Sequence, residues 1–249
     1  MVEGLYLIGS AALDDFQPSA SDVDFLAVTS EPPDNAAVAA LGRAHARLRK
    51  HRKRPFFDGG YVTWSQLRHD PAEAAPGPTA HEGRLRPTPS APGPVEWHTL
   101  AQAGVRCRGP EPAELGIWTN TDVLRRWVLR NLDDYWGKLR RAGDCLPTKY
   151  GVASLTPYAT VWCATGLSRI HYTLATGEIT SKAGGARYAL TAFAPRWRRI
   201  NSEALRIRCR SDRRSLYRTA IARRRDLLGF WDMLYDDAQC IGATLPPRC

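Results

Sequence analysis

The sequence predicts an α+β protein, in which a mixed sheet with flanking helices is followed by an all-α helical domain. Two observations carry this prediction. The first part of the chain alternates short apolar runs with turn residues, as strands and their connections do. After Gly109-Pro110, apolar residues recur at steps of three and four, which is typical of helices. We therefore place an N-terminal domain at residues 1–117 and a helical C-terminal domain at residues 118–249.

Short apolar or aromatic runs bounded by glycine, proline and polar residues are the predicted strands of the N-terminal domain. These strands are residues 5–8, 22–28, 56–64, 95–100 and 104–107. The Ala-rich stretch 34–52 has apolar residues on one face and arginine and lysine on the other, which predicts an amphipathic helix. Residues 70–94 are rich in proline, alanine and glycine without periodicity, and they are predicted to form a loop.

The second half of the chain predicts a series of helices. An apolar stripe at positions 124, 128, 132, 135 and 139 marks the first, and residues 158–175 form the second, which Gly177 is placed to end. Ser181 can cap a third helix that runs to about residue 193. Pro195 interrupts the pattern before a long Arg-rich helical region that extends to about residue 237.

The positive charge of the chain is concentrated in one segment. The net charge is +10, and residues 196–225 hold twelve arginines against Glu203 and Asp212, so this segment accounts for the whole excess. A basic segment of this density fits an anionic partner such as nucleotide phosphates or nucleic acid. The alternative is a solvated helix face in an Arg-rich composition.

Composition excludes several other classes of protein. An apolar content of 43% with eight tryptophans predicts a folded chain, and no apolar run approaches the length of a membrane span. The start of the chain resembles neither a signal peptide nor a transit peptide, so we expect a cytoplasmic protein. The six cysteines form no C-x-x-C pair, which favours free thiols over disulfides and makes a zinc site unexpected.

A short pattern near the start of the chain predicts a site for phosphates and metal. The apolar run 5–8 ends in Gly9-Ser10, and after eleven residues a second run opens with Asp22-Val23-Asp24. Side chains two residues apart on a strand point to the same face, so Asp22 and Asp24 would lie side by side and need a cation between them. Magnesium prefers such oxygen ligands and shares its coordination shell with substrate phosphates. The Gly9-Ser10 turn offers backbone N–H groups and a hydroxyl to a phosphate.

A third carboxylate is expected on a neighbouring strand. The candidates are Asp58, Glu73, Glu82 and Glu96. Glu73 and Glu82 lie in the Pro-rich segment, and backbone shape alone explains Asp58 beside two glycines. Glu96 stands between Val95 and Trp97 in an apolar run, where a carboxyl group has a raised pKa that suits a general base.

These motifs resemble the signature of the nucleotidyltransferase (polymerase β-like) superfamily, and two more narrow the resemblance. Val95-Glu96-Trp97-His98 is similar to the Glu-Trp element of aminoglycoside 3″-type (streptomycin/spectinomycin) adenylyltransferases. The stretch from Leu167 to Lys182, followed by Tyr188-Ala189-Leu190, resembles the helical C-terminal domain of the same family. Related folds usually carry a helix ahead of the first strand, so either this fold manages without it or the chain starts upstream of Met1.

The resemblance implies Mg²⁺-dependent transfer of AMP from ATP to a hydroxyl of a small aminoglycoside-like acceptor, by a monomer that confers antibiotic resistance. It implies that Glu96 is the general base and that Arg169 and Lys182 contact the nucleotide phosphates. It also implies acids about ten residues before Arg169, where Ala159 and Thr160 stand instead, with Tyr158 and Trp162 beside them. Two alternatives stay open: a nucleotidyltransferase that modifies RNA or a protein hydroxyl through the 196–225 segment, and a catalytically silent nucleotide-binding relative.

Overall fold

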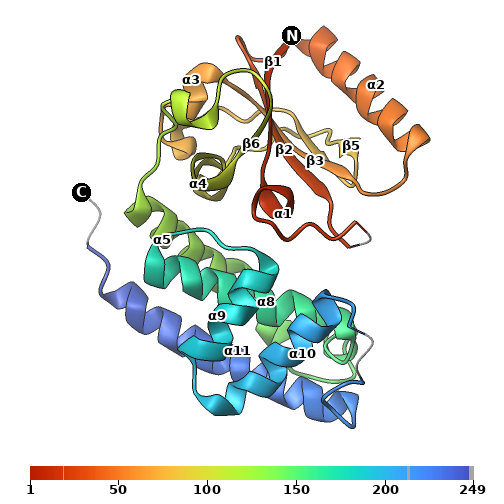
Figure 1. Ribbon diagram of the computed structural model, residues 1–249, viewed down its shortest axis with the longest axis vertical. Helices are drawn as coiled ribbons and strands as arrows, with labels where there is room; N and C mark the ends of the chain where they lie inside the picture. The colour runs from red at the N-terminus through yellow and green to blue at the C-terminus, as the bar shows by residue number, and fades with distance from the viewer. Residues whose placement is uncertain (19, 212–213, 247–249) are drawn as a thin grey trace. The chain divides into compact units, whose positions relative to one another are not determined.

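The computed structural model describes residues 1–18, 20–211 and 214–246, which form two compact units. The first unit spans Met1–Asn120 and the second begins at Thr121. Together they make the α+β fold that the sequence predicts: a mixed sheet in the first unit and a helical second unit (Figure 1). No helix of the described residues is long and apolar enough to cross a bilayer.

The first unit is built on a six-stranded sheet with the order β5-β4-β3-β2-β1-β6. Strands β2 and β3 are parallel, and the other neighbouring pairs are antiparallel. The strand bounds are β1 Val2–Leu7, β2 Val23–Thr29, β3 Phe57–Thr63, β4 Thr79–His81, β5 Arg84–Leu85 and β6 Val105–Arg108. The parallel pairing sets Asp24 directly opposite Asp58, so these two residues share one face of the sheet.

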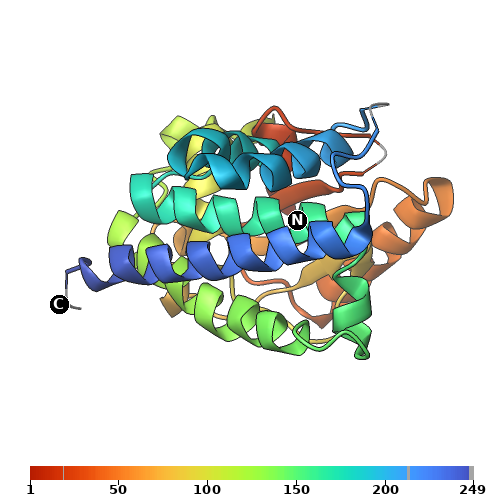
Figure 2. The ribbon, with the colours of Figure 1, turned by 90° about the horizontal axis from the view of Figure 1, so that it is seen from below.

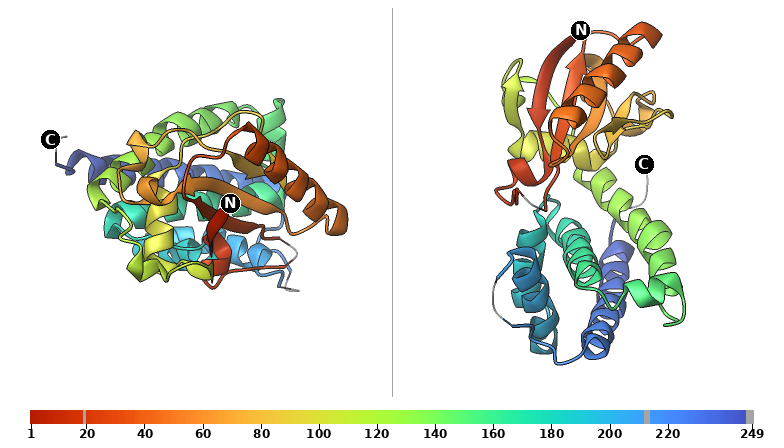
Figure 3. Two further views of the ribbon diagram at one scale, coloured as in Figure 1. Left: turned by 90° about the horizontal axis from the view of Figure 1, so that it is seen from above. Right: turned by 90° about the vertical axis from the view of Figure 1, so that its right-hand side faces the viewer.

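Helices cover both faces of the sheet. On one face lies α2 (Asn35–His51), drawn in orange in Figure 3. Its Leu41 packs against a core that contains Phe25 and Tyr61. On the other face the short α3 (Trp64–Leu67) and α4 (Pro94–Ala103) cover the core, with Trp97 and Leu100 fully buried. Helix α2 begins where Asp34 accepts a hydrogen bond from the amide of Ala37 at 2.7 Å, as an N-cap does.

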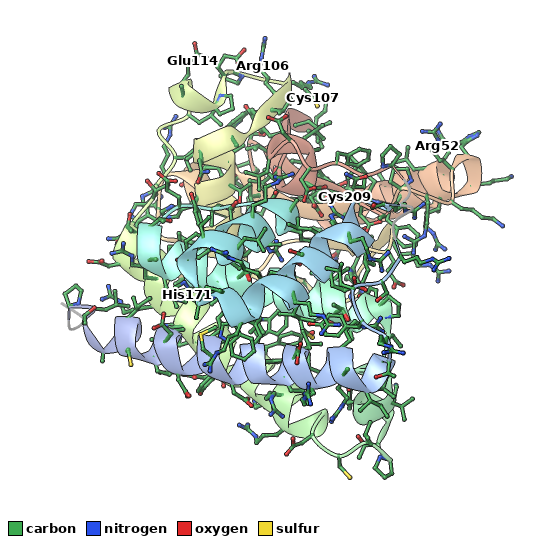
Figure 4. All side chains as sticks on the ribbon, turned by 60° about the horizontal axis from the view of Figure 1, so that its bottom comes forward. Arg52, Arg106, Cys107, Glu114, His171 and Cys209 are labelled. Carbon is green, nitrogen blue, oxygen red and sulfur yellow. The ribbon has the colours of Figure 1, made fainter. Side chains whose placement is uncertain are left out.

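The second unit packs its helices around α8. The helix bounds are α5 Thr121–Asn131, α6 Lys138–Ala142, α7 Lys149–Ala153, α8 Pro157–Thr176, α9 Lys182–Ala192, α10 Arg198–Arg208 and α11 Ala220–Ala243. Helix α8 contacts α5, α9, α10 and α11, and Figure 2 shows α8 and α11 running alongside each other. His171 of α8 joins two of these neighbours: its Nδ1 lies 2.9 Å from the Tyr188 hydroxyl and its Nε2 lies 2.6 Å from Asp237 (Figure 4).

Two of the predicted helix boundaries in this unit rest on local signals and are confirmed. Gly177 ends α8 with φ of 78°, in the left-handed region that glycine adopts without strain. The hydroxyl of Ser181 accepts a hydrogen bond from the amide of Gly184 at 3.0 Å and caps α9.

Three sequence predictions are wrong in detail. Residues 95–100 are helical, because Gly93-Pro94 starts α4 and Glu96 caps it. The segment 70–94 is not one loop, since it contains strands β4 and β5. The region from Pro195 to residue 237 is not one long helix, because α10 ends at Arg208 and α11 begins at Ala220.

The arginines of 196–225 do more than coat a solvated helix face. Arg206 pairs with the buried Glu203 at 2.8 Å, and Arg224 donates hydrogen bonds to Ser154 and to backbone carbonyls. Arg208 and Arg223 are buried. Part of the basic excess therefore lies inside the helical unit, which weakens the case for a nucleic-acid surface made from this segment. Asp212 lies outside the described residues.

Five cysteines, Cys107, Cys145, Cys163, Cys209 and Cys240, are free thiols, and Cys249 lies outside the described residues. Within the described part of the chain, the prediction of free thiols is confirmed.

Candidate active site

A cavity of about 360 Å³ in the first unit brings together residues that the sequence singled out. It opens over the sheet face that α4 covers. Gly9 from the start of α1, Asp24 from β2, Asp58 from β3 and Glu96 from α4 all line it. Three carboxylates from three elements thus face one cavity within a single domain.

The turn after β1 is shaped by the contact between Gly9 and Asp24. Gly9 begins the short helix α1 (Gly9–Ala12) with φ of 59°, and the amide of Ile8 donates to the carbonyl of Asp24 at 2.9 Å. A Cβ atom on Gly9 would lie 2.1 Å from Oδ2 of Asp24, which is impossible without displacing the carboxylate. Ser10 follows in the same turn and is half-buried. Only glycine lets the backbone approach Asp24 this closely.

Replacing Gly9 by alanine should therefore move Asp24 and strain the turn. We expect Gly9→Ala to lower any catalysis in this cavity by at least about 100-fold, because both the left-handed φ and the contact with Asp24 oppose a side chain. Gly42→Ala is the matched control, since a Cβ there meets nothing within 4 Å. Equal activity of the two variants would show that the Gly9 contact does not shape the site.

Asp22 and Asp24 occupy different surroundings. Asp22 precedes β2, and its Oδ1 accepts a hydrogen bond from the amide of Phe56 at 3.3 Å and lies 3.8 Å from the guanidinium of Arg54. Asp24 lines the cavity, whereas Asp22 is not among the residues that form its wall. The shared metal role of the two carboxylates stays a prediction.

Glu96 is held at the start of α4 by a hydrogen bond to the backbone of the N-cap residue. It is the third residue of the helix, and its Oε2 accepts a hydrogen bond from the amide of Gly93 at 3.1 Å. Burial raises the pKa of the Glu96 carboxyl, and the hydrogen bonds from the amides of Glu96 and Gly93 oppose this shift. A carboxyl group with a raised pKa in a cavity has the properties of a general base at neutral pH. Glu96 thus has the buried surroundings that the sequence predicts, on a helix and not on a strand, and its role as general base stays a prediction.

Asp58 has a structural task in addition to its place in the cavity. Its two carboxylate oxygens accept hydrogen bonds from the amides of Glu82 at 2.9 Å and Gly83 at 2.7 Å. These two residues connect β4 to β5 with φ of 52° and 66°. The carboxylate therefore fixes the β4–β5 hairpin against β3, which agrees with a backbone role for Asp58.

Arg169 and Lys182 come from neighbouring helices of the second unit. Gly185 of α9 makes room for Arg169, because a Cβ atom on Gly185 would lie 2.8 Å from Cγ of Arg169. Lys182 is the first residue of α9, and its ammonium lies 5.4 Å from the centre of the Trp162 ring. The α8–α9 pair thus carries two cations, one of them at a helix N-terminus, where anions are favoured.

Comparison with known proteins tests the resemblance. Residues 157–223 match the family model of the aminoglycoside adenylyltransferase C-terminal domain. The fold is similar to a crystal structure of spectinomycin adenyltransferase AAD(9) from Enterococcus faecialis with ATP and spectinomycin. That similarity has a TM-score of 0.61 at 14% sequence identity, over 93% of this chain and 92% of the other. No curated protein sequence matches this chain.

Residues 157–223 therefore resemble the C-terminal domain of aminoglycoside adenylyltransferases, and the chain shares the fold of a solved adenyltransferase. The matched segment contains α8 and α9, and therefore both Arg169 and Lys182. The cavity of the first unit is the candidate active site.

The donors around this cavity fit magnesium. Magnesium binds through one or two carboxylates and completes its shell with water and substrate phosphates. Among the described residues, no three His, Cys, Asp or Glu side chains are grouped closely enough to hold a metal by themselves. Asp24, lying against the glycine turn, is the carboxylate best placed to share a metal with a phosphate.

Sequence reasoning set Asp58 aside as a site residue, although the structure brings it to the cavity. Asp58 reaches the cavity because it lies near the start of β3, which pairs in parallel with β2 and so sets Asp58 opposite Asp24. His98 lies two residues after Glu96, and on a strand the two side chains would share one face. On a helix such residues do not face each other, and His98 is buried, which lowers its pKa.

Proposed function

We propose that this chain transfers AMP from ATP to a hydroxyl of an aminoglycoside or aminocyclitol. The observation that carries the proposal is the meeting of Asp24, Glu96 and the Gly9 turn in one cavity, in a chain whose helical unit matches this family. The structural neighbour was solved with ATP and spectinomycin, which supports this choice of nucleotide and acceptor class.

In the proposed reaction the acceptor hydroxyl oxygen bonds to the α-phosphorus of ATP. The bond from that phosphorus to the bridging oxygen breaks, and pyrophosphate leaves. Glu96 takes the proton of the hydroxyl, and its capping hydrogen bond holds the carboxyl in one orientation. Gly9 and Ser10 offer the turn that contacts phosphate, and Arg169 and Lys182 stabilise the charge that grows on the leaving group.

Asp22 and Asp24 would hold the Mg²⁺ that this chemistry needs. When bound, the ion neutralises the triphosphate and so lowers the barrier to attack. The carboxylate of Asp24 is kept against the glycine turn, so that the metal and the phosphate-binding backbone would be neighbours.

A pyrophosphate-release assay tests the proposal. With ATP, Mg²⁺ and a panel of spectinomycin, streptomycin and kanamycin, we expect release that depends on at least one acceptor and stops when the metal is chelated. Asp24→Asn should lower this rate by at least about 100-fold, because a metal ligand contributes several kcal/mol to the transition state. Asp70→Asn, a change in a half-buried helix cap outside the cavity wall, is the control.

Nucleotide binding without acceptor-dependent release would contradict the proposal. It would favour the catalytically silent relative if no acceptor of any class reacts. It would favour a macromolecular substrate if RNA or protein becomes adenylylated instead.

A further inference from the structure

The C-terminal half of α2 and the residues that follow it carry a dense group of positive charges. Residues 35–57 contain no aspartate or glutamate, whereas seven of the twelve residues in 43–54 are arginine or lysine. Six of these cations form a surface that we call the α2 basic patch: Arg43, Arg47, Arg49, Lys50, Arg52 and Lys53. Arg49 is half-buried and the other five are exposed. Figure 4 labels Arg52 at the end of this helix.

The α2 basic patch is not neutralised by acids of the first unit. The seventh cation, Arg54, lies 3.8 Å from Asp22 and is therefore left out of the patch. Among the described residues, no carboxylate lies within ion-pair distance of the six members. Arg49 packs against the β4–β5 turn, where a Cβ atom on Gly83 would lie 2.9 Å from its Cγ. The acid of that turn, Glu82, is exposed and forms no ion pair with Arg49.

The spacing of the cations puts like charges next to one another. Arg43, Arg47 and Lys50 follow one another at steps of four and three, so they lie on one face of α2. Like charges at this spacing destabilise a helix. The helix dipole favours cations in the last turn, but Arg43 and Arg47 lie before that turn. A partner with several negative charges along this face would relieve the repulsion.

The length of the α2 basic patch favours a polyanion over a single phosphate. From Arg43 to the end of α2 at His51 the helix axis rises by about 12 Å, at about 1.5 Å per residue. One phosphate group cannot contact cations at both ends of this span. Each strand of a nucleic-acid duplex carries a phosphate about every 3.4 Å along the axis, so several phosphates can face the patch at once.

The remaining surface of α2 favours a duplex over a single strand or a membrane. Residues 35–54 contain no phenylalanine, tyrosine or tryptophan, whereas proteins bind single strands by stacking the bases on aromatic rings. Leu41 of α2 packs against the core of the sheet, and Leu48 is its exposed large apolar side chain. The helix therefore lacks the broad apolar face that a membrane-surface helix buries in the lipid.

The exposed side of α2 is also narrow enough for a groove. Alanine stands exposed among or before the cations at four positions, which are 39, 40, 44 and 46. An α-helix with its side chains is about 10–12 Å across, and the major groove of B-form DNA, about 12 Å wide, admits one. The major groove of an A-form RNA duplex is too narrow for this.

We propose that the α2 basic patch binds the phosphates of double-stranded B-form DNA, with the exposed side of α2 at the major groove. The contacts are made by charge, so the binding does not depend on base sequence. This surface is carried by the first unit and does not rest on the adenylyl-transfer activity.

Fluorescence anisotropy of the full chain with a labelled DNA duplex of about two helical turns tests this inference. At about 50 mM salt the Kd should be on the order of 1 µM or below. Raising the salt to about 200 mM should raise the Kd by about 10²- to 10³-fold, because each of about four to six phosphate contacts adds about 0.9 to the salt slope.

A triple variant, Arg43→Gln with Arg47→Gln and Lys50→Gln, removes three charges and keeps good helix formers. It should raise the Kd at least about 30-fold at about 50 mM salt and lower the salt slope by about 2.7. The charge-preserving triple variant, with lysine at 43 and 47 and arginine at 50, should stay within about 3-fold of the wild type. Arg52→Gln with Lys53→Gln changes only residues after the end of α2, and it should raise the Kd at least about 5-fold.

The matched control removes three exposed arginines from the segment 196–225: Arg214→Gln, Arg218→Gln and Arg225→Gln. It should stay within about 3-fold of the wild-type Kd. Far-ultraviolet circular dichroism shows that each variant is folded. The inference is overturned if the DNA duplex does not bind at about 50 mM salt, or if the control weakens binding as much as the α2 triple variant. It is also overturned if an RNA duplex, a single strand or anionic lipid vesicles bind more tightly than the DNA duplex.

Discussion

Glu96→Gln is expected to lower the rate of acceptor-dependent pyrophosphate release by about 10²- to 10⁴-fold, the contribution of a general base. The Kd for ATP should change little. Glutamine keeps an oxygen that can accept the Gly93 amide, and glutamine is a normal member of a capping box, so α4 should begin as before. The variant thus removes the ability to take a proton while it preserves the local structure. Single-turnover kinetics and nucleotide titration measure the two effects separately.

The pH profile adds an independent test of Glu96. The base must be deprotonated to act, so kcat/KM falls as pH drops through its pKa. Because burial raises that pKa, the acid limb should lie above the ordinary glutamate value of about 4.3. The limb should be absent from the residual activity of Glu96→Gln.

Glu114 provides the matched control. It is also the third residue of a helical turn, and its Oε2 accepts the amide of Glu111 at 3.0 Å in a capping box on the exposed surface. Glu114→Gln makes the same chemical change and should leave the rate and the profile unaltered. A Glu96→Gln enzyme with wild-type turnover would exclude Glu96 as the base.

The parts of the fold that sequence predicts well are those with strong local signals. Gly177 and Ser181 mark the end of α8 and the start of α9 because each supplies a specific backbone geometry or hydrogen bond. The amphipathic pattern of 34–52 identifies α2 for the same reason, since one face meets the sheet and the other meets water.

Residues 95–100 were predicted as a strand and form part of helix α4, because the spacing of their apolar residues does not distinguish the two. Trp97, His98, Thr99 and Leu100 are all buried, so no alternation of burial distinguishes a strand from a helix. Gly93-Pro94 with Glu96 two residues later was the better signal, because it starts a helix and caps it. Glu96 was singled out in spite of this error, because its motif does not depend on secondary structure, and the structure places it in the cavity wall. Asp58 was undervalued because its nearness to Asp24 arises from strand pairing, which a single sequence does not state.

The break between α10 and α11 has a physical cause in Glu203, which leads to the second large expected effect. Glu203 is completely buried on α10. Arg206 donates two hydrogen bonds to it, at 2.8 and 2.9 Å, and Ser215 and the amide of Leu216 donate at 2.6 and 3.0 Å. The carboxylate thus ties the segment before α11 back onto α10. The Arg-rich sequence alone predicts a continuous helix, whereas the hydrogen bonds of Glu203 hold Ser215 and Leu216 against α10 before α11 begins.

Glu203→Ala should lower the free energy of unfolding at neutral pH by about 3 kcal/mol. Removing the Glu203 carboxylate leaves the charge of Arg206, the Ser215 hydroxyl and the Leu216 amide without their acceptor. Urea unfolding followed by far-ultraviolet circular dichroism measures this change. Glu178→Ala is the control, because Glu178 is exposed and loses only one hydrogen bond from Tyr172. Equal stability of the two variants would contradict a structural role for the Glu203 network.

The same network predicts how stability depends on pH. Burial raises the pKa of Glu203, but the hydrogen bonds from Arg206, Leu216 and Ser215 outweigh it and lower the pKa from 4.5 to about 2. A carboxyl whose pKa is lower in the folded state stabilises the fold above its unfolded pKa and loses that contribution as pH falls toward 2. The difference in stability between the wild type and Glu203→Gln should therefore be largest above about pH 5. It should shrink by about 3 kcal/mol toward pH 2, because lowering a pKa by one is worth about 1.4 kcal/mol. A difference that stays constant over this range would mean that the carboxylate charge contributes nothing, and that the segment is held by its other contacts.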